Sequence, residues 1–326
     1  MIRLFSLITA FALTLGMAAA AEPVTLRFGV IDNSVRNVPS IPLYIAQRNG
    51  YFTRQGIDLK VVVLKGVEHQ VEGLMDGTVD ITYTAVPYLI QAVLKGSDAV
   101  GVIGAPANQV FTLVARPGIK SYADLKGKLV AMSLPQDTIS IATRMLLEKH
   151  GLQPGDYKTV DLVGSAVRVD CLVKGECAAA GADQPRDIVL MRQGYTRLGD
   201  TLEVVPVLQF SVLAARRPWA ETHKDTIVKF ARAYADGYRF MRDPKNWDAV
   251  GRVMVETTDA KPDMTTEILK LYYQPDRGVM PKQAEIKMDG IEKVIQMLAD
   301  TGQIPKPALA PSRFIDLQYL KAAGLQ

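Results

Sequence analysis

The chain has 326 residues, of which 48% are hydrophobic and 22% are charged, and two are cysteines. This composition is typical of a globular protein and excludes a disordered chain, a collagen-like rod and a small cysteine-stapled domain. The net charge of +4 is too small an excess for the clustered basic face of a nucleic-acid-binding protein, so we expect no nucleic-acid partner.

The first 21 residues have the pattern of an export signal. Arg3 gives a positive start, residues 4–16 are almost uninterruptedly apolar, and residues 18–21 are alanines that a signal peptidase accepts. The apolar run is shorter than the ~20 residues that cross a bilayer, which argues against a membrane anchor. No cysteine lies near the cleavage point, so we expect no lipid anchor. We predict a cleaved signal over residues 1–21 and a periplasmic mature protein of about 305 residues, enough for two domains.

From residue 22 onward, strand and helix patterns alternate. The strands are expected at residues 26–30, 59–64, 80–84 and 99–104, and the helices at 42–56, 68–76 and 88–94. Pro42 stands in the first turn of the first helix, a position that tolerates proline. Repeated βαβ units with right-handed crossovers predict a parallel, doubly wound sheet.

The alternation restarts after residue 120 and then gives way to helices. A short helix and turn is expected at 121–128, strands at 128–133, 158–163 and 177–182, and helices at 140–150, 166–173 and 186–192. A strand at 203–216 is followed by helices at 222–241, 247–255, 264–272, 284–300 and 315–323. This second α/β unit predicts a second sheet.

Two near-copies, Leu113-Val-Ala-Arg-Pro117 and Leu213-Ala-Ala-Arg-Arg-Pro218, bracket the second unit. If both are strands that cross between lobes, they form a pair of hinge strands. We therefore predict an α/β fold of two lobes, each a doubly wound, mostly parallel sheet. Lobe 1 comprises residues 22–114 and 214–326, including the C-terminal helices, and lobe 2 comprises residues 115–213. Such a fold places a ligand cleft between the lobes, at the carboxyl ends of the strands.

Several motifs occur in a characteristic order. They are Pro42-Leu-Tyr-Ile-Ala-Gln47, Gly50-Tyr-Phe52, Gly56-Ile-Asp58, Leu74-Met-Asp-Gly77-Thr-Val-Asp80, Asp124-Leu-Lys-Gly-Lys128, Leu172-Val-Lys-Gly175-Glu176 and Asp183-Gln-Pro185. In each of the two Leu-x-x-Gly motifs the glycine ends a helix just before a strand.

Over residues 24–325 the chain resembles the periplasmic substrate-binding proteins of ABC transporters. The resemblance is to the branch that handles nitrate, alkanesulfonates, taurine and thiamine-pyrimidine precursors, and it implies the type II periplasmic binding fold. The family usually has Asp where Ala178 stands, and an aliphatic residue where Cys177 stands. Neither departure lies in the expected cleft.

Loops at strand carboxyl ends supply the candidate ligand-binding residues. Three of them put a hydroxyl and free backbone N–H groups at a helix start, an arrangement that binds anions without an arginine. The alternative is that Ser40, Thr84 and Thr138 only cap their own helices. The candidates are Asn37, Val38, Ser40, His69, Thr84, Ala85, Val86, Ser133, Gln136, Thr138, Asp183, Gln184 and Phe210.

Asp183 restricts the kind of ligand that fits. Its carboxylate would repel a bare anion but would attract an amine or a hydroxyl. A ligand that combines an anionic head with such a group therefore fits better than nitrate. The alternative is that Asp183 caps the helix at 186–192.

The two cysteines, Cys171 and Cys177, lie on either side of the Gly175 turn. Export to an oxidising compartment favours a disulfide between them, and the alternative is two separately buried thiols. His69, His150 and His223 lie far apart in the sequence, and no HExxH or CxxC pair occurs, so we expect no metal site. We expect no cofactor either.

These features predict a periplasmic solute-binding protein, not an enzyme. It would capture a small polar ligand by closure of the cleft, and this ligand would be anionic or zwitterionic, like a sulfonate or taurine. The protein would be a monomer and would deliver the ligand to an inner-membrane ABC permease. One alternative ligand is a thiamine-pyrimidine-type heterocycle or an aromatic carboxylate. Two rival functions are that of a periplasmic sensory protein and that of an enzyme like the pyrimidine synthases of the same fold branch. The resemblance implies that those synthases carry a cysteine-rich segment and clustered histidines for iron, which this chain lacks.

Overall fold

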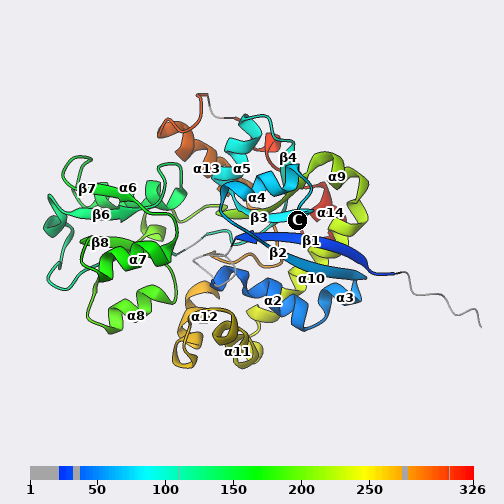
Figure 1. Ribbon diagram of the computed structural model, residues 1–326, viewed down its shortest axis with the longest axis horizontal. Coiled ribbons are helices and arrows are strands. Elements are labelled where there is room, and N and C mark those ends of the chain that lie inside the picture. The colour runs from blue at the N-terminus through cyan, green and yellow to red at the C-terminus, as the bar shows by residue number, and fades with distance from the viewer. Residues whose placement is uncertain (1–21, 32–36, 109, 274–277, 308) are drawn as a thin grey trace, which may run out of the picture.

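A computed structural model describes residues 22–31, 37–108, 110–273, 278–307 and 309–326. The predicted export signal, residues 1–21, lies outside them. The described residues form two five-stranded sheets that lie side by side, each with its own helices (Figure 1). Within these ranges, no helix combines the length and the apolarity needed to span a membrane.

The first sheet has the strand order β2-β1-β3-β10-β4. β1 runs parallel to β2 and β3, whereas β10 runs antiparallel to β3 and β4. Continuous apolar strands such as β4 fit a sheet that is covered on both faces. The strands are β1 (Val24–Ile31), β2 (Ile57–Leu64), β3 (Ile81–Ala85), β4 (Ala99–Gly104) and β10 (Ser211–Arg216).

The second sheet has the equivalent order, β7-β6-β8-β5-β9. β6 runs parallel to β7 and β8, and β5 is antiparallel to β8 and β9. The strands are β5 (Thr112–Ala115), β6 (Leu129–Met132), β7 (Lys158–Asp161), β8 (Ala179–Ala182) and β9 (Thr196–Asp200). Each sheet thus has one antiparallel strand at the same position, and the predicted α/β fold with two mostly parallel sheets is confirmed.

The chain passes between the sheets twice, at residues 105–111 and 201–210. The expected hinge connections are present, but their described residues form no strand. Each segment contains a proline, Pro106 or Pro206, which has no N–H for a strand ladder. The near-copies noted in the sequence lie instead in β5 and β10, the antiparallel strand of each sheet. These strands begin three residues before residues 115 and 214, where the sequence placed the boundaries between the lobes. The exact lobe boundaries stay a prediction.

The two connecting segments are hydrogen-bonded to each other. The Phe210 N–H donates to the Ala107 carbonyl over 2.7 Å, and the Thr201 N–H donates to the Phe111 carbonyl over 3.0 Å. The Asn108 side-chain amide donates to the Val205 carbonyl over 3.0 Å. The segments therefore form a paired connection between the lobes.

Helices pack on both sheets (Figure 1). Around the first sheet they are α2 (Ile41–Arg48), α3 (Tyr51–Arg54), α4 (Glu68–Met75), α5 (Val86–Leu94), α9 (Arg217–Thr222), α10 (Lys224–Arg242), α11 (Trp247–Thr257), α12 (Thr265–Tyr273), α13 (Met288–Asp300) and α14 (Gln318–Ala323). Around the second they are α6 (Thr138–Lys149), α7 (Ser165–Val173) and α8 (Arg186–Arg192).

The C-terminal helices complete the core of the first lobe. Phe230 of α10 lies between two residues from the start of the chain, with ring centroids 5.7 Å from Phe28 of β1 and 4.9 Å from Phe52 of α3. All three rings are buried. Because burying one such side chain contributes about 1.5–3 kcal/mol, this cluster fixes α10 against the N-terminal elements.

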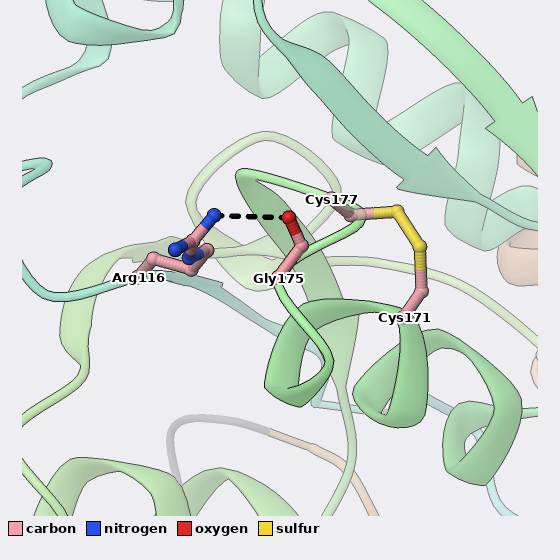
Figure 2. The surroundings of a disulfide bond; sticks show 4 residues. All are labelled: Arg116, Cys171, Gly175 and Cys177. Carbon is pink, nitrogen blue, oxygen red and sulfur yellow. Dashed lines mark hydrogen bonds between the residues drawn. A yellow bond between two sulfur atoms is a disulfide. The ribbon is translucent and has the colours of Figure 1, made fainter.

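Cys171 and Cys177 form a disulfide that closes the turn between α7 and β8 (Figure 2). Their Cα atoms lie 5.4 Å apart, within the usual range for a disulfide. Gly175, between them, has a φ of +81°, which favours glycine. The Arg116 guanidinium donates to its carbonyl over 3.0 Å, so the turn is also tied to the segment after β5.

Candidate functional site

A cavity of about 130 Å³ lies between the lobes. This volume is close to that of an engineered cavity of ~150 Å³ that takes up benzene, so a molecule of about that size fits. Residues at or just after the carboxyl ends of strands line it: Ile31 ends β1, Ala85 ends β3, and Ser133, Gly164 and Asp183 follow β6, β7 and β8. This is where ligands bind in open α/β sheets.

Aromatic side chains form part of the cavity wall. Tyr83 and Tyr88 come from the first lobe, and Phe111 and Phe210 come from the two connecting segments. The rings of Phe111 and Phe210 are tilted at 49° with centroids 6.5 Å apart. Burial raises the pKa of Tyr83 to about 12, so its hydroxyl stays protonated at neutral pH.

Three helices begin at the cavity. The lining includes Pro87 and Tyr88 in the first turn of α5, Thr138 and Ile139 at the start of α6, and Ser165 at the start of α7. Helix N-termini carry unpaired N–H groups and the positive end of the helix dipole. The combination favours negatively charged groups of a ligand.

Asp137, the residue before α6, lines the cavity and is buried. The Ser133 hydroxyl donates a hydrogen bond to its carboxylate. Burial raises the pKa of Asp137, while hydrogen bonds from the Ser133 and Tyr88 hydroxyls and the charge of Arg168 oppose that rise. Asp137 is thus an acceptor held in a largely desolvated wall.

Asp183 also lines the cavity, and one oxygen of its carboxylate is paired with an arginine. Arg186 donates to the Asp183 carboxylate over 3.0 Å and to Asp259, near the end of α11 in the first lobe, over 3.0 Å. Pro185, not Asp183, stands at the N-cap of α8. The side chain of Asp183 therefore pairs with an arginine instead of capping the helix.

Arg168, in the first turn of α7, is the buried cation of the cavity lining. Its Nε donates to the Gly181 carbonyl over 2.9 Å, and its Nη1 donates to the Leu162 carbonyl over 3.1 Å. Burial lowers its pKa, and the charges of Asp183 and Asp137 oppose this effect. An arginine remains charged even so, because its unperturbed pKa is far above neutral.

Six of the sequence candidates are brought together in this lining, where their contact with a ligand remains a prediction: Asn37, Ala85, Ser133, Thr138, Asp183 and Phe210. They come from both lobes and from one connecting segment. Thr138 is the first residue of α6 and follows the N-cap residue, Asp137.

The other candidates lie outside the lining. Val38, Thr84 and Val86 are buried in the first lobe, and Thr84 pairs with Val212 across the sheet. His69 is exposed on α4. Of the remaining three, Ser40 donates a hydrogen bond to Asn37 over 3.0 Å, and Gln136 lines a separate surface hollow. Gln184 forms hydrogen bonds with Tyr272 and Asp187.

Several lining residues were not among the candidates. The main ones are Gln70, Tyr83, Tyr88, Phe111, Asp137, Ser165 and Arg168. Ser165 and Arg168 belong to α7, the helix that follows β7, and none of the candidates came from this strand end. The rule that ligands lie at the carboxyl ends of parallel strands would have found them.

The chain belongs to the NMT1/THI5-like family, whose pattern matches residues 37–246. It is similar to YtlA of Bacillus subtilis, named as a binding-protein candidate, with 21% identity over 93% of this chain and 92% of that one. It is 26% identical to the formylaminopyrimidine-binding protein of Halalkalibacterium halodurans over 68% of this chain and 67% of that one. A Saccharomyces cerevisiae pyrimidine phosphate synthase, THI11, matches 45% of this chain and 47% of its own length at 24% identity.

Solved structures of the same fold include binding proteins of import systems. The alkanesulfonate-binding protein SsuA of Xanthomonas axonopodis superposes with a TM-score of 0.69 at 18% identity, over 90% of this chain and 99% of that one. The nitrate-binding protein NrtA of Synechocystis superposes with a TM-score of 0.74 at 15% identity, over 93% and 89%. The chain thus has the periplasmic-binding-protein fold found in ABC importers, and the sequence-based resemblance is confirmed.

Proposed function

We propose that this protein is the solute-binding component of an ABC importer and binds a small organic ligand in the cavity between its lobes. The observation that carries the proposal is the cavity itself, since strand ends from both sheets and both connecting segments line it. A ligand that contacts both lobes stabilises the closed form in proportion to its preference for that form. The fold shared with SsuA and NrtA supports the same proposal.

The ligand proposed first is anionic or zwitterionic, like a sulfonate or taurine. Helix N-termini meet the cavity and suit an anion, and the carboxylates of Asp137 and Asp183 suit an amine on the same molecule. A flat heterocycle of the pyrimidine type is the second candidate, because Tyr83, Phe111 and the other aromatic side chains offer faces on which a ring packs.

The remaining parts of the proposal follow from the same role. The protein is exported with its signal removed, works as a monomer without a cofactor, and delivers its ligand to an inner-membrane ABC permease. It binds and releases the ligand unchanged, so it is not an enzyme. Within the described residues, no three metal-binding side chains gather into a cluster.

The test is calorimetric binding and thermal unfolding with a panel of taurine, alkanesulfonates, nitrate, pyrimidine precursors and aromatic carboxylates. A true ligand present at 100 times its Kd should stabilise the folded protein by about 2.7 kcal/mol. Product analysis of the same mixtures should find every ligand unchanged. Chemical conversion of a panel member, or no stabilisation by any of them, would overturn the proposal.

A matched pair of variants locates the site. Asp183→Asn changes a cavity carboxylate, whereas Asp161→Asn changes an exposed carboxylate on β7 of the same lobe. We expect the first variant to bind an amine-bearing ligand more weakly and the second to bind like the wild type. Equal affinity in both variants would place the ligand elsewhere.

A further inference from the structure

Arg168 carries a buried positive charge that the protein does not neutralise by direct contact. The side chain is only 1% exposed, and a desolvated ion is costly unless a partner of opposite charge compensates it. Asp183, whose charge favours the Arg168 cation, is bound to Arg186 instead. Among the described residues, no carboxylate forms an ion pair with Arg168.

The guanidinium is nevertheless held firmly in place. Backbone carbonyls of Gly181 and Leu162 accept from Nε and Nη1, and the guanidinium carbon lies 5.7 Å from the centre of the Phe111 ring. Nη2, with two N–H donors, has no hydrogen-bond partner in the described part of the chain. The side chain lines the cavity, so donors on a fixed cation are available to a ligand there.

The neighbours of Arg168 also favour an anion. Arg168 and Ser165 both lie in the first turn of α7, where the helix dipole is positive. The Ser165 oxygen accepts from the Asp183 N–H over 3.0 Å, which leaves the serine proton free to be donated. Donors and positive charge therefore converge on one end of the cavity.

We propose that Arg168, with Ser165 and the start of α7, forms an anion subsite, and that the ligand is an organic sulfonate or carboxylate, not a neutral heterocycle. This inference rests on the proposed importer function and names the ligand class of the same cavity. The anionic group accepts from Nη2 and neutralises the buried charge, and an amine on the ligand faces Asp137 and Asp183. Charge-assisted hydrogen bonds of this kind are stronger than neutral ones.

The first experiment compares anionic ligands with neutral ones of the same shape on the wild-type protein. The probes are taurine against its sulfonamide, benzenesulfonate against benzenesulfonamide, and benzoate against benzamide, measured by calorimetry at constant ionic strength. We expect the anionic member of a bound pair to have a Kd at least about 30-fold lower. Tight binding of a neutral member without preference for the anion overturns the subsite but leaves the importer role standing.

The second experiment changes the cation. We expect Arg168→Gln to raise the Kd of the anionic probe at least about 30-fold and to abolish the preference over the neutral probe, whereas Arg168→Lys retains part of it. Arg116 is an exposed arginine of the same lobe, so Arg116→Gln is the matched control and should bind like the wild type.

Unchanged affinity in a folded Arg168→Gln protein overturns the subsite. If that variant does not fold, the lysine variant and the paired ligands decide the question. Failure of the wild type to bind any probe overturns both the subsite and the importer function.

Discussion

At the scale of single residues, the carboxylate of Asp187 has an unusual environment. It accepts hydrogen bonds from the Thr112 hydroxyl and the Gln184 amide, each over 2.7 Å, and faces a second cavity between the lobes. Burial raises its pKa to about 6, and the negative charge of Asp183 acts in the same direction. The hydrogen bonds favour the charged form and partly oppose this rise. The other charged residues around this cavity are Arg197, Asp200, Glu267 and Lys270.

This pKa predicts a pH-dependent stability. The folded chain binds the Asp187 proton more tightly than the unfolded chain, so the resulting stabilisation is complete below about pH 4 and is lost as the pH rises through about 6. A rise from 3.8 to about 6 corresponds to about 3 kcal/mol. Urea unfolding at pH 4, 6 and 7.5 should show the wild type losing up to that much stability relative to Asp187→Asn. Parallel pH profiles for the two proteins would contradict the prediction, and Asp161→Asn should follow the wild type.

Site residues could be predicted from the sequence where they directly follow a recognisable strand. Ser133 and Asp183 directly follow strands β6 and β8 whose ends meet at the cleft, so both could be predicted. Arg168 could not be recognised from its type, because arginines usually face solvent, and its burial depends on the carbonyls of Leu162 and Gly181. Tertiary packing, not local pattern, selects it.

At the scale of elements, the disulfide between α7 and β8 constrains a turn that the protein also holds by other contacts. The bridge closes a short loop, since its cysteines are six residues apart. The loop-entropy relation gives about 2 kcal/mol for a loop of this length. Both sulfur-bearing side chains are buried, so serine in their place must also be desolvated.

We therefore expect the Cys171→Ser, Cys177→Ser double variant to fold, with a free energy of unfolding lower by about 2 kcal/mol. Chemical denaturation of both proteins, with and without a reducing agent, measures this difference. Reduction should destabilise the wild type by a similar amount and leave the double variant unaffected. A reductant effect of equal size in both proteins would show that the bridge is not its source. Ligand affinity should not change, because neither cysteine lines the cavity.

Some helix and strand boundaries differ from those expected from the sequence, because of a glycine turn in one case and a polar edge strand in another. The helix expected at 42–56 is divided into α2 and α3 at Gly50, whose φ is +67°. Strand β9 was missed because its sequence, TRLGD, has no apolar run, although it pairs with β5. The apolar residues 204–208 suggested a strand, but they belong to a connecting segment that contains Pro206.

The helix expected at 284–300 also begins late, at Met288. Ala284 has a φ of +70°, which a helix does not allow, and its carbonyl accepts from the Gly104 N–H over 2.8 Å. A Cβ at Gly104 would lie 2.0 Å from the Glu285 carbonyl oxygen. Long-range packing against β4 therefore sets where α13 begins, and no local pattern contains that information.

At the scale of the whole molecule, a series of buried side-chain hydrogen bonds joins the lobes, in addition to the two connecting segments. The Tyr272 hydroxyl of α12, in the first lobe, donates to the Gln184 side-chain carbonyl of the second lobe over 3.0 Å. The Gln184 amide in turn donates to Asp187. Both Tyr272 and Gln184 are about 1% exposed, so an unpaired group here would be costly. Because this hydrogen bond joins the lobes, it favours the lobe arrangement of this structure over a more open one.

Removal of that hydroxyl should therefore open the protein. Tyr272→Phe keeps the ring but breaks the hydrogen bond, which costs about 1 kcal/mol or more in the present lobe arrangement and nothing in a more open one. The ligand must then offset a less favourable closure, so its apparent Kd should rise about 5-fold, and small-angle X-ray scattering should show a larger ligand-free radius of gyration. Tyr273→Phe is a matched control, because the hydroxyl of this neighbour on α12 has no hydrogen-bond partner among the described residues. If both variants show the same radius and the same affinity as the wild type, the Tyr272 hydrogen bond does not contribute to closure.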